Sequence, residues 1–384
     1  MIRGDGLFGP SLTTPEMAAA VSDRAWLTAL LRFETELART QAELGLISAE
    51  EAAAVVGVCT PDRFDGDRLG QEAIRSANPV VPLVLALKAA LGSDRAGAVH
   101  LGATSQDALD TATMLISQRA LALIRTDLDA LAGCCAGLAE AHRSTVMAGR
   151  TLMQQAVPIT FGLKAAGWLT ALVDARHRLA SYQSHRLAVQ FGGAAGNLSG
   201  LGDRGLEVRA GLAARLGLQE PVISWHSDRS RIVELAAVLA QAGGAAGKIA
   251  LDILLLSQTE VGEVAEAAPG GSSAMAHKQN SVASIEADAC VRGLMGQVSV
   301  LTNSQRVEHE RAAGAWQAEW PAVTGALLLA AGAVARSREA VTGLRVDPER
   351  MRANLGPDLA PGSHPGATDA LIDRALAHHR KEIS

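Results

Sequence analysis

The sequence predicts an all-α protein whose centre is a bundle of long helices. From Ser105 to about Ala141 the chain has no proline, and apolar residues recur at the three- and four-residue spacing of a helix. Such a helix of ~35 residues would be ~50 Å long. Similar runs cover about 158–190, 229–266, 283–304 and 319–345. Alanine, leucine and glycine dominate and aromatic residues make up only 3% of the chain, which favours closely packed helices.

Short helices are expected before the first long one. Thr14–Pro15 is typical of a helix start, with proline at the first helical position. A second helix is expected to open at Ser22 and to end at Gly45. Ser48–Glu51 forms the pattern of a capping box for a third. The segment 76–82 is expected to be an extended bend, since each of its prolines disfavours helix in the residue before it.

Long helices need one another to bury their apolar stripes, so five of them indicate an elongated bundle. Their alanine-rich faces are apolar on more than one side, which predicts burial against other subunits as well. We divide the chain into an N-terminal helical domain (1–103), a central long-helix bundle (104–346) and a short C-terminal helical segment (347–384). The sequence shows neither a β-rich domain nor a repeat of fixed period.

Composition excludes several classes of function. The 384 residues carry a net charge of −5, which argues against a nucleic-acid surface, as does a single tyrosine, Tyr182. The four cysteines form no CxxC pair, which favours a reduced, cytoplasmic protein. The N-terminus lacks the apolar stretch of a signal peptide, and charged or polar residues interrupt the apolar runs too often for a membrane span.

The most informative stretch is the polar loop Pro269–Asn280, which lies between two long helical patterns. Two glycines allow a ligand to approach the backbone closely, and Ser272, Ser273, Lys278 and Asn280 follow within the same loop. Serine, lysine and backbone N–H groups together suit a carboxylate or an enolate. Composition alone is equally compatible with a solvated connection between helices.

Two further polar clusters precede this loop. In His100–Asp107, Thr104 or Ser105 can cap the long helix that follows, and a helix N-terminus also attracts anions. A plain cap explains this segment as well as a binding role does. The second cluster, Gly149–Thr160, combines Thr151 and Gln154 with a proline near its end.

These three clusters together resemble the signatures of the fumarase/aspartase superfamily. The loop is similar to GSSxMPxKxNP, His100–Asp107 to a TSxD region, and Gly149–Thr160 to THxQxAxPxT. The likeness runs from about Asp23 to about Val346, with the signatures in the family's order and spacing. Further matching stretches are Phe161–Trp168, Leu201–Gly205, Trp225–Ser227 and Glu308–Trp316.

The chain departs from these signatures at three positions. Ala276 and Ser281 stand where the family usually has proline, so the loop is expected to be more mobile than usual. Leu152 replaces the histidine of the fumarases and of the lyases that expel nitrogen. Those leaving groups need a proton from an acid, whereas a carboxylate with a pKa near 4 leaves or adds without one. The resemblance therefore implies the branch that lactonises 3-carboxy-cis,cis-muconate in protocatechuate breakdown.

The resemblance also implies roles for individual residues. Ser272 would give a proton to carbon and take it back in reverse, which requires a closed, dry loop because a neutral serine is a poor base. Backbone N–H groups near Ser273 and Met275 would stabilise an enediolate. Lys278, Asn280 and Arg311 would hold carboxylates. The remaining pocket residues would be His100, Thr104, Ser105, Thr151 and Gln154. No metal or organic cofactor is implied, and the superfamily's homotetramers share each site among subunits.

Competing motifs are incomplete. Gly271–Ala274 lacks the closing glycine of a nucleophile elbow, and no lysine follows either serine at SxxK spacing. Gly192–Asn197 lacks the context of a nucleotide-binding loop. Glu308–Glu310 could ligate a cation, but a solvated helix face is the simpler interpretation.

Three alternative functions stay open. The first is a cycloisomerase of a sulfonated or otherwise substituted muconate, and the second is a C–N lyase of secondary metabolism that releases fumarate. The third is a structural tetramer without activity, against which the intact Ser272, Lys278 and Asn280 weigh.

Overall fold

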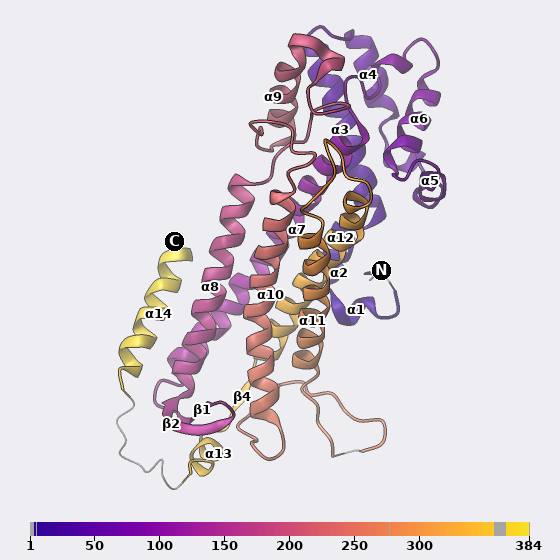
Figure 1. Cartoon of the computed structure of the whole chain (residues 1–384). Helices are drawn as coiled ribbons and strands as arrows, with labels where there is room; N and C mark the ends of the chain where they lie inside the picture. The colour runs from indigo at the N-terminus through magenta and orange to yellow at the C-terminus, as the bar shows by residue number, and fades with distance from the viewer. Residues whose placement is uncertain (1–3, 5, 276, 357–365, 384) are drawn as a thin grey trace.

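The protein is an elongated helical bundle in a computed structural model that describes residues 4, 6–275, 277–356 and 366–383 (Figure 1). Five long helices run along its axis and confirm the all-α prediction. They are α7 (Ser105–Ala141), α8 (Phe161–His185), α10 (Ser230–Ser257), α11 (Val282–Asn303) and α12 (Ala315–Val341). With 37 residues, α7 is about 55 Å long and reaches from one end of the bundle to the other.

Short helices gather at the upper end of Figure 1 around the start of α7. They are α3 (Asp23–Glu43), α4 (Ala49–Val58), α5 (Gly66–Ala73), α6 (Val80–Leu91) and α9 (Gly205–Leu216). The predicted caps are present: the Ser22 hydroxyl accepts the Ala25 N–H, and Ser48 forms a capping box with Glu51. Nearer the middle, α1 (Gly9–Leu12) and α2 (Pro15–Ala20) lie beside the long helices. Three 3-10 turns, η1 (Pro61–Arg63), η2 (Ala96–Ala98) and η3 (Ser199–Arg204), complete this part of the chain.

The lower end carries the few strands. The antiparallel hairpin of β1 (Val146–Thr151) and β2 (Gln154–Thr160) connects α7 to α8. A second pair, β3 (Val264–Ala265) with β4 (Arg345–Val346), joins the end of α10 to the segment after α12. Beyond it come α13 (Pro348–Ala353) and α14 (Thr368–Ile383), which packs along α8.

Two expectations about where helices begin and end are wrong. The helix expected over 229–266 ends at Ser257, because Gln258 is extended and Gly262 takes a left-handed conformation (φ +63°) in the turn that follows. The bend expected over 76–82 stops at Val80, where α6 begins. Pro82 is tolerated in the first turn of that helix because its missing N–H would have no intrahelical partner there.

Small residues bring the long helices close together. A Cβ atom on Gly243 or Gly247 of α10 would lie within 2.7 Å of Leu294 or Val291 of α11. On α12, a Cβ on Gly332 would be 2.1 Å from the Leu12 carbonyl oxygen. The glycines therefore set the distances between α10, α11, α12 and the N-terminal segment.

The apolar faces of the bundle are unequally covered. By length and composition alone α10 and α12 could cross a membrane, contrary to the expectation that every apolar run is interrupted, but both belong to the bundle. The most apolar stretch of α12 is 72% buried, whereas that of α10 is 44% buried. On the outer face of α10 and α11, Leu251, Ile285 and Met295 are 43%, 48% and 40% exposed. A long apolar face is thus left open in the single chain.

We expect Gly332→Ala to destabilise the protein by about 1–3 kcal/mol, because the added methyl group meets backbone atoms that cannot move aside. Gly133→Ala on α7 is the matched control: a Cβ there meets nothing within 4 Å, and alanine is the better helix former, so stability should rise by up to about 1 kcal/mol. Urea unfolding at one protein concentration measures both. Equal stability of the two variants would contradict the packing described for Gly332.

Candidate active site

The residues expected to form the site lie at opposite ends of one chain. Thr104 and Ser105 are at the start of α7, at the upper end of the bundle. Thr151 and Gln154 flank the tip of the β1–β2 hairpin at the lower end. The signature loop, 269–280, also extends from the lower end, on the other side of α10 in Figure 1.

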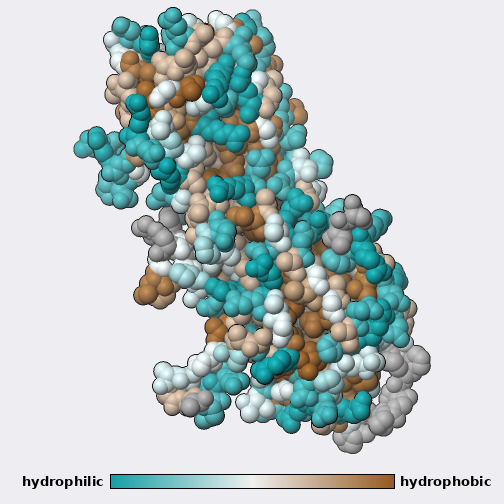
Figure 2. Space-filling model, turned by 180° about the vertical axis from the view of Figure 1, so that it is seen from behind, coloured by the Kyte–Doolittle hydropathy of each residue, from teal (hydrophilic) through white to brown (hydrophobic). Residues whose placement is uncertain are grey.

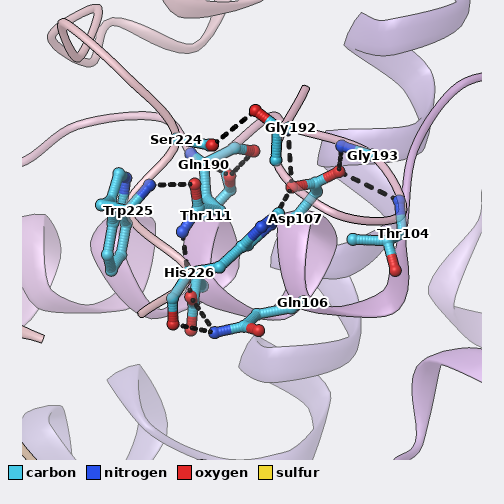
Figure 3. A network of polar contacts seen from close by, with 12 residues as sticks. Thr104, Gln106, Asp107, Thr111, Gln190, Gly192, Gly193, Ser224, Trp225 and His226 are labelled. Carbon is cyan, nitrogen blue, oxygen red and sulfur yellow. Dashed lines mark hydrogen bonds and ion pairs between the residues drawn. The ribbon is translucent and has the colours of Figure 1, made fainter. Parts of the chain in front are cut away.

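At the upper end, Asp107 organises the chain around the first turn of α7 (Figure 3). Its carboxylate is fully buried and accepts four hydrogen bonds. Oδ1 accepts the Gly192 N–H (2.9 Å) and the ring of His226 (Nε2 at 2.6 Å), and Oδ2 accepts the N–H groups of Gly193 (2.9 Å) and Thr104 (3.0 Å). Thr104 is therefore the N-cap residue, and the glycine-rich segment lies directly against it.

Arg311 reaches this end from the loop between α11 and α12. Its guanidinium donates to Gln106 Oε1 (3.1 Å) and to the carbonyls of Gly193 (3.3 Å) and Ala194 (2.7 Å). Gly193 thus binds Asp107 through its N–H and Arg311 through its carbonyl. The structure brings Arg311 to the same end as Thr104 and Ser105, where a cation and the N-terminus of a helix both favour a carboxylate.

A buried ionic group lies one turn further along α7. Arg229 is fully buried and donates to both oxygens of Asp110 (2.7 and 3.0 Å) and to both oxygens of Glu319 (3.0 and 2.5 Å). Asp110 also accepts the Trp316 indole N–H (3.0 Å) and the Gln106 amide (3.1 Å). Burial raises the pKa of the Glu319 carboxyl, while the guanidinium of Arg229 opposes that shift. The group connects α7, α10 and α12 at the end that carries Thr104 and Arg311.

His100 is held by a buried acid. Its Nδ1 lies 2.6 Å from Oε1 of Glu34 on α3, and its backbone is left-handed (φ +60°). Burial alone would lower the pKa of the ring, but the charge of Glu34 outweighs it and raises the pKa above its ordinary value. The ion pair with Glu34 therefore fixes the ring of His100 beside the start of α7.

The hairpin tip presents Thr151, Leu152, Met153 and Gln154 to solvent. Leu152 and Met153 have φ values of +51° and +66°, a conformation that costs non-glycine residues energy, and they are 96% and 71% exposed. No side chain at this tip is an acid or a base. Arg150 anchors the hairpin through Glu263, whose side chain is fully buried.

The signature loop is closed at its base and exposed along its length. Gly270 and Asn280 exchange backbone hydrogen bonds (2.9 and 2.8 Å), and the Ser272 hydroxyl accepts the N–H groups of Ala274 (3.3 Å) and Met275 (3.2 Å). In this conformation the Met275 N–H therefore serves Ser272 rather than a ligand. Ser273 and Lys278 are exposed. Figure 2 shows the loop standing away from the bundle. A pocket of about 1100 Å³ has Ala267 and Ala268, which precede the loop, among its lining residues.

Ala276 and Ser281 are the two residues that depart from the loop signature. Ala276 lies outside the described residues. Ser281 is the N-cap residue of α11, and its hydroxyl is 2.9 Å from that of Ser257 at the end of α10.

The described residues include no group of three or more His, Cys, Asp or Glu side chains placed to hold a metal ion. The helix face expected for Glu308–Glu310 is wrong: the three residues lie in the turn before α12, where Glu308 accepts the Ala313 N–H at 2.9 Å. Here the left-handed conformation of His309 (φ +43°) departs from helical geometry.

Comparison with known proteins places the chain in a family. A family profile described as lyase matches residues 11–299. The chain belongs to this lyase family. It is 44% identical over 371 residues to a nitrosuccinate lyase of Streptomyces davaonensis, covering 93% of this chain and 78% of the relative. It is 42% identical over 390 residues to a 3-carboxy-cis,cis-muconate cycloisomerase of Pseudomonas aeruginosa, covering 99% and 85%.

A solved structure agrees with these relatives. The 3-carboxy-cis,cis-muconate lactonizing enzyme of Pseudomonas putida superposes with a TM-score of 0.92 at 34% identity, covering 98% of this chain and all of that one. The resemblance and the fold class predicted from the three signatures are therefore confirmed.

Within this lyase fold, sequence reasoning missed the residues that hold the site together. Asp107 and His226 were noticed only as parts of longer motifs, and Asp110, Arg229 and Glu319 were not singled out. One signal was available: Asp110 interrupts an otherwise apolar stretch of α7, and a buried charge requires a partner. Which partners it has could not be read from the sequence, because they lie 119 and 209 positions further along the chain.

We expect Glu319→Ala to lower stability by about 3–5 kcal/mol, because it leaves Arg229 buried with half of its counter-charge. Glu72→Ala removes a surface ion pair with Arg68 and should cost no more than about 0.5 kcal/mol. Thermal unfolding of both variants at a fixed protein concentration makes the comparison. A similar loss of stability in the two variants would contradict the conclusion that the buried ion pairs of Arg229 hold the three helices together.

Proposed function

We propose that the protein is a cycloisomerase that reversibly lactonises 3-carboxy-cis,cis-muconate to 4-carboxymuconolactone. The observation that carries the proposal is the hairpin tip, where Leu152 occupies the position of the family's acid–base histidine and no neighbouring side chain supplies a proton. A reaction whose nucleophile and leaving group is a carboxylate does not need that proton. Relatives from several bacteria bear the name of this activity.

The reaction joins one substrate carboxylate to a carbon of a C=C bond. The electron pair of that bond moves toward a second carboxylate and forms an enediolate, which then takes a proton at carbon. Catalysis requires cations or N–H groups that stabilise the second carboxylate as its charge grows, together with a proton donor above the carbon. In the reverse direction the same donor removes the proton.

Ser272 suits the role of proton donor in its loop. Two backbone N–H groups, of Ala274 and Met275, point at its oxygen. Hydrogen bonds to an oxygen favour its charged form, so these donors would stabilise the serine alkoxide after proton transfer. Lys278 and Asn280 lie in the same loop and would bind carboxylate oxygens. The Ser273 N–H would be a further donor. The Met275 N–H would join it by turning from Ser272 to the substrate as the loop closes, which leaves the Ala274 N–H on the serine oxygen.

The upper end of α7 would bind the other carboxylates of the substrate. Thr104 and Ser105 lie at the N-terminus of the helix, Arg311 supplies a guanidinium, and His100 lies beside them, paired with Glu34. The guanidinium of Arg311 and the N–H groups of the first helical turn are the donors that would hold these carboxylates.

Assembly would bring the two ends together. The start of α7 and the signature loop lie at opposite ends of a bundle about as long as α7, roughly 55 Å, so one chain cannot close them around one small substrate. A homotetramer with antiparallel neighbours would place the upper end of one copy beside the hairpin and loop of others. The open apolar face of α10 and α11, with Leu251, Ile285 and Met295, offers a surface for that contact.

A cytoplasmic location in protocatechuate breakdown is the setting that fits this activity. Among fumarate-releasing reactions, cleavage of nitrosuccinate is the specific alternative, because a relative of 44% identity is named nitrosuccinate lyase. A substituted muconate is the nearer competitor, since the carboxylate-binding groups described above do not identify the substituent at C3.

We expect the purified protein to convert 3-carboxy-cis,cis-muconate at about 1–10³ s⁻¹, followed by loss of the diene absorbance in the ultraviolet. Parallel assays with sulfomuconate and with nitrosuccinate, the latter followed by fumarate release, serve as comparisons. A kcat/KM for 3-carboxymuconate at least tenfold above both would support the proposal. A higher value for either comparison substrate, or no turnover of any of the three, would overturn it.

A further inference from the structure

The geometry points to His226 as a positioning residue that fixes the carboxylate-binding end of α7 through Asp107. The inference rests on the proposed function, because it takes Thr104 and Arg311 to be groups that hold the substrate. His226 lies in the connection between α9 and α10, and its side chain is only 3% exposed, so it is closed off from a bound substrate. It therefore acts through other residues and does not touch the reacting atoms.

The first link is the pair of His226 and Asp107. The carboxylate oxygen accepts the Nε2–H at 2.6 Å, which fixes the tautomer of the ring (Figure 3). With this bond, each carboxylate oxygen of Asp107 accepts two hydrogen bonds. The carboxylate thereby holds both Thr104 and the glycine segment in place. Removing the imidazole would leave Oδ1 with the single donor Gly192.

The second link runs from the backbone of His226 to Arg311. The carbonyl oxygen of His226 accepts the Gln106 amide (2.9 Å), and the Gln106 carbonyl accepts Arg311 Nη1 (3.1 Å). The ring side of His226 leads through Asp107 to Gly193, whose carbonyl also binds Arg311. Two chains of hydrogen bonds therefore start at one residue and end on the same guanidinium.

The glycine segment is shaped to lie against this ring. A Cβ atom on Gly192 would be 2.9 Å from the His226 ring carbon Cε1 and 2.6 Å from the Ser224 Cβ. Gly193 and Gly196 have φ values of +69° and +86°. The Gly192–Asn197 segment thus has a role that the sequence did not reveal. It links Asp107 to Arg311, because Gly193 binds both of them.

The other ring nitrogen indicates that the pairing with Asp107, rather than general polarity, is what the position requires. His226 Nδ1 is buried and has no hydrogen-bond partner among the described residues. A buried acceptor without a partner is unfavourable, so a residue that only filled space would be more stable as a leucine. The hydrogen bond from Nε2 to Asp107 therefore explains why this buried position holds a histidine.

The test compares His226→Leu, which fills the site without a donor, with His226→Gln, whose amide nitrogen can reach the place of Nε2. His379→Leu is the matched control: His379 is a buried histidine of α14 with 9% exposure, and its Nδ1 also has no hydrogen-bond partner among the described residues. Two readouts are needed, because a loss of folded protein would lower kcat alone and leave KM unchanged.

For His226→Leu we expect KM for 3-carboxymuconate to rise about 10- to 50-fold with a smaller change in kcat. For His226→Gln we expect KM to stay within about threefold of the KM of the unsubstituted protein. Hydrogen exchange of the peptide that spans 190–198 should quicken about tenfold or more in the leucine variant, and in neither of the other two variants.

The exchange readout separates this inference from the proposed function, because it needs no substrate. Absence of turnover by the unsubstituted protein would overturn the proposed function and leave the exchange result to decide the positioning role. Unchanged exchange in His226→Leu, a fall in kcat with KM constant, or equal damage from leucine and glutamine would each overturn the role of His226.

Discussion

The fold depends above all on the buried charge of Arg229. Its guanidinium binds two carboxylates, Asp110 and Glu319, so that α7, α10 and α12 meet in one register at the upper end of the bundle. A buried ionic group of this kind contributes little net stability, but it strongly penalises any arrangement that separates its members. One turn away, Asp107 uses the same rigid frame to hold the N-cap of α7 and the glycine segment. The start of α7 and the glycine segment are thus positioned by buried charges.

In the proposed shared site, this frame holds apart the two parts that one chain would contribute. Helices as long as α7 keep their two ends apart, and each end is built separately: the upper end around Asp107 and Arg311, the lower end around Glu263 and the base of the signature loop. Glu263 anchors the hairpin through Arg150, while Gly270 and Asn280 close the loop. What remains exposed, the apolar tip of Leu152 and Met153 and the outer face of α10 and α11, is the surface that neighbouring copies would cover.

The sequence predicted the long helices well because their periodicity and caps are local signals. Ser22, Ser48 and Thr104 begin helices where their side chains predict it. The end of α10 was misplaced because its apolar pattern continues past Ser257, while the turn depends on the backbone of Gly262. The signature residues could be recognised by motif, but their separation within one chain was expected only from the superfamily resemblance and the length of the helices, since the distance between motifs depends on how helices pack. Likewise Arg229 and its partners are remote in sequence, and only the fold reveals them.

Mixed assemblies test the central claim, which is that one site takes its residues from several copies. Ser272→Ala and Gln154→Ala, each nearly inactive alone, should regain up to about a quarter of the wild-type activity when they are unfolded together and refolded, since some sites then receive both intact residues from different chains. A mixture of separately refolded variants is the control and should stay inactive. Co-refolded tetramers, verified by light scattering, that remain as inactive as the single variants would contradict the account.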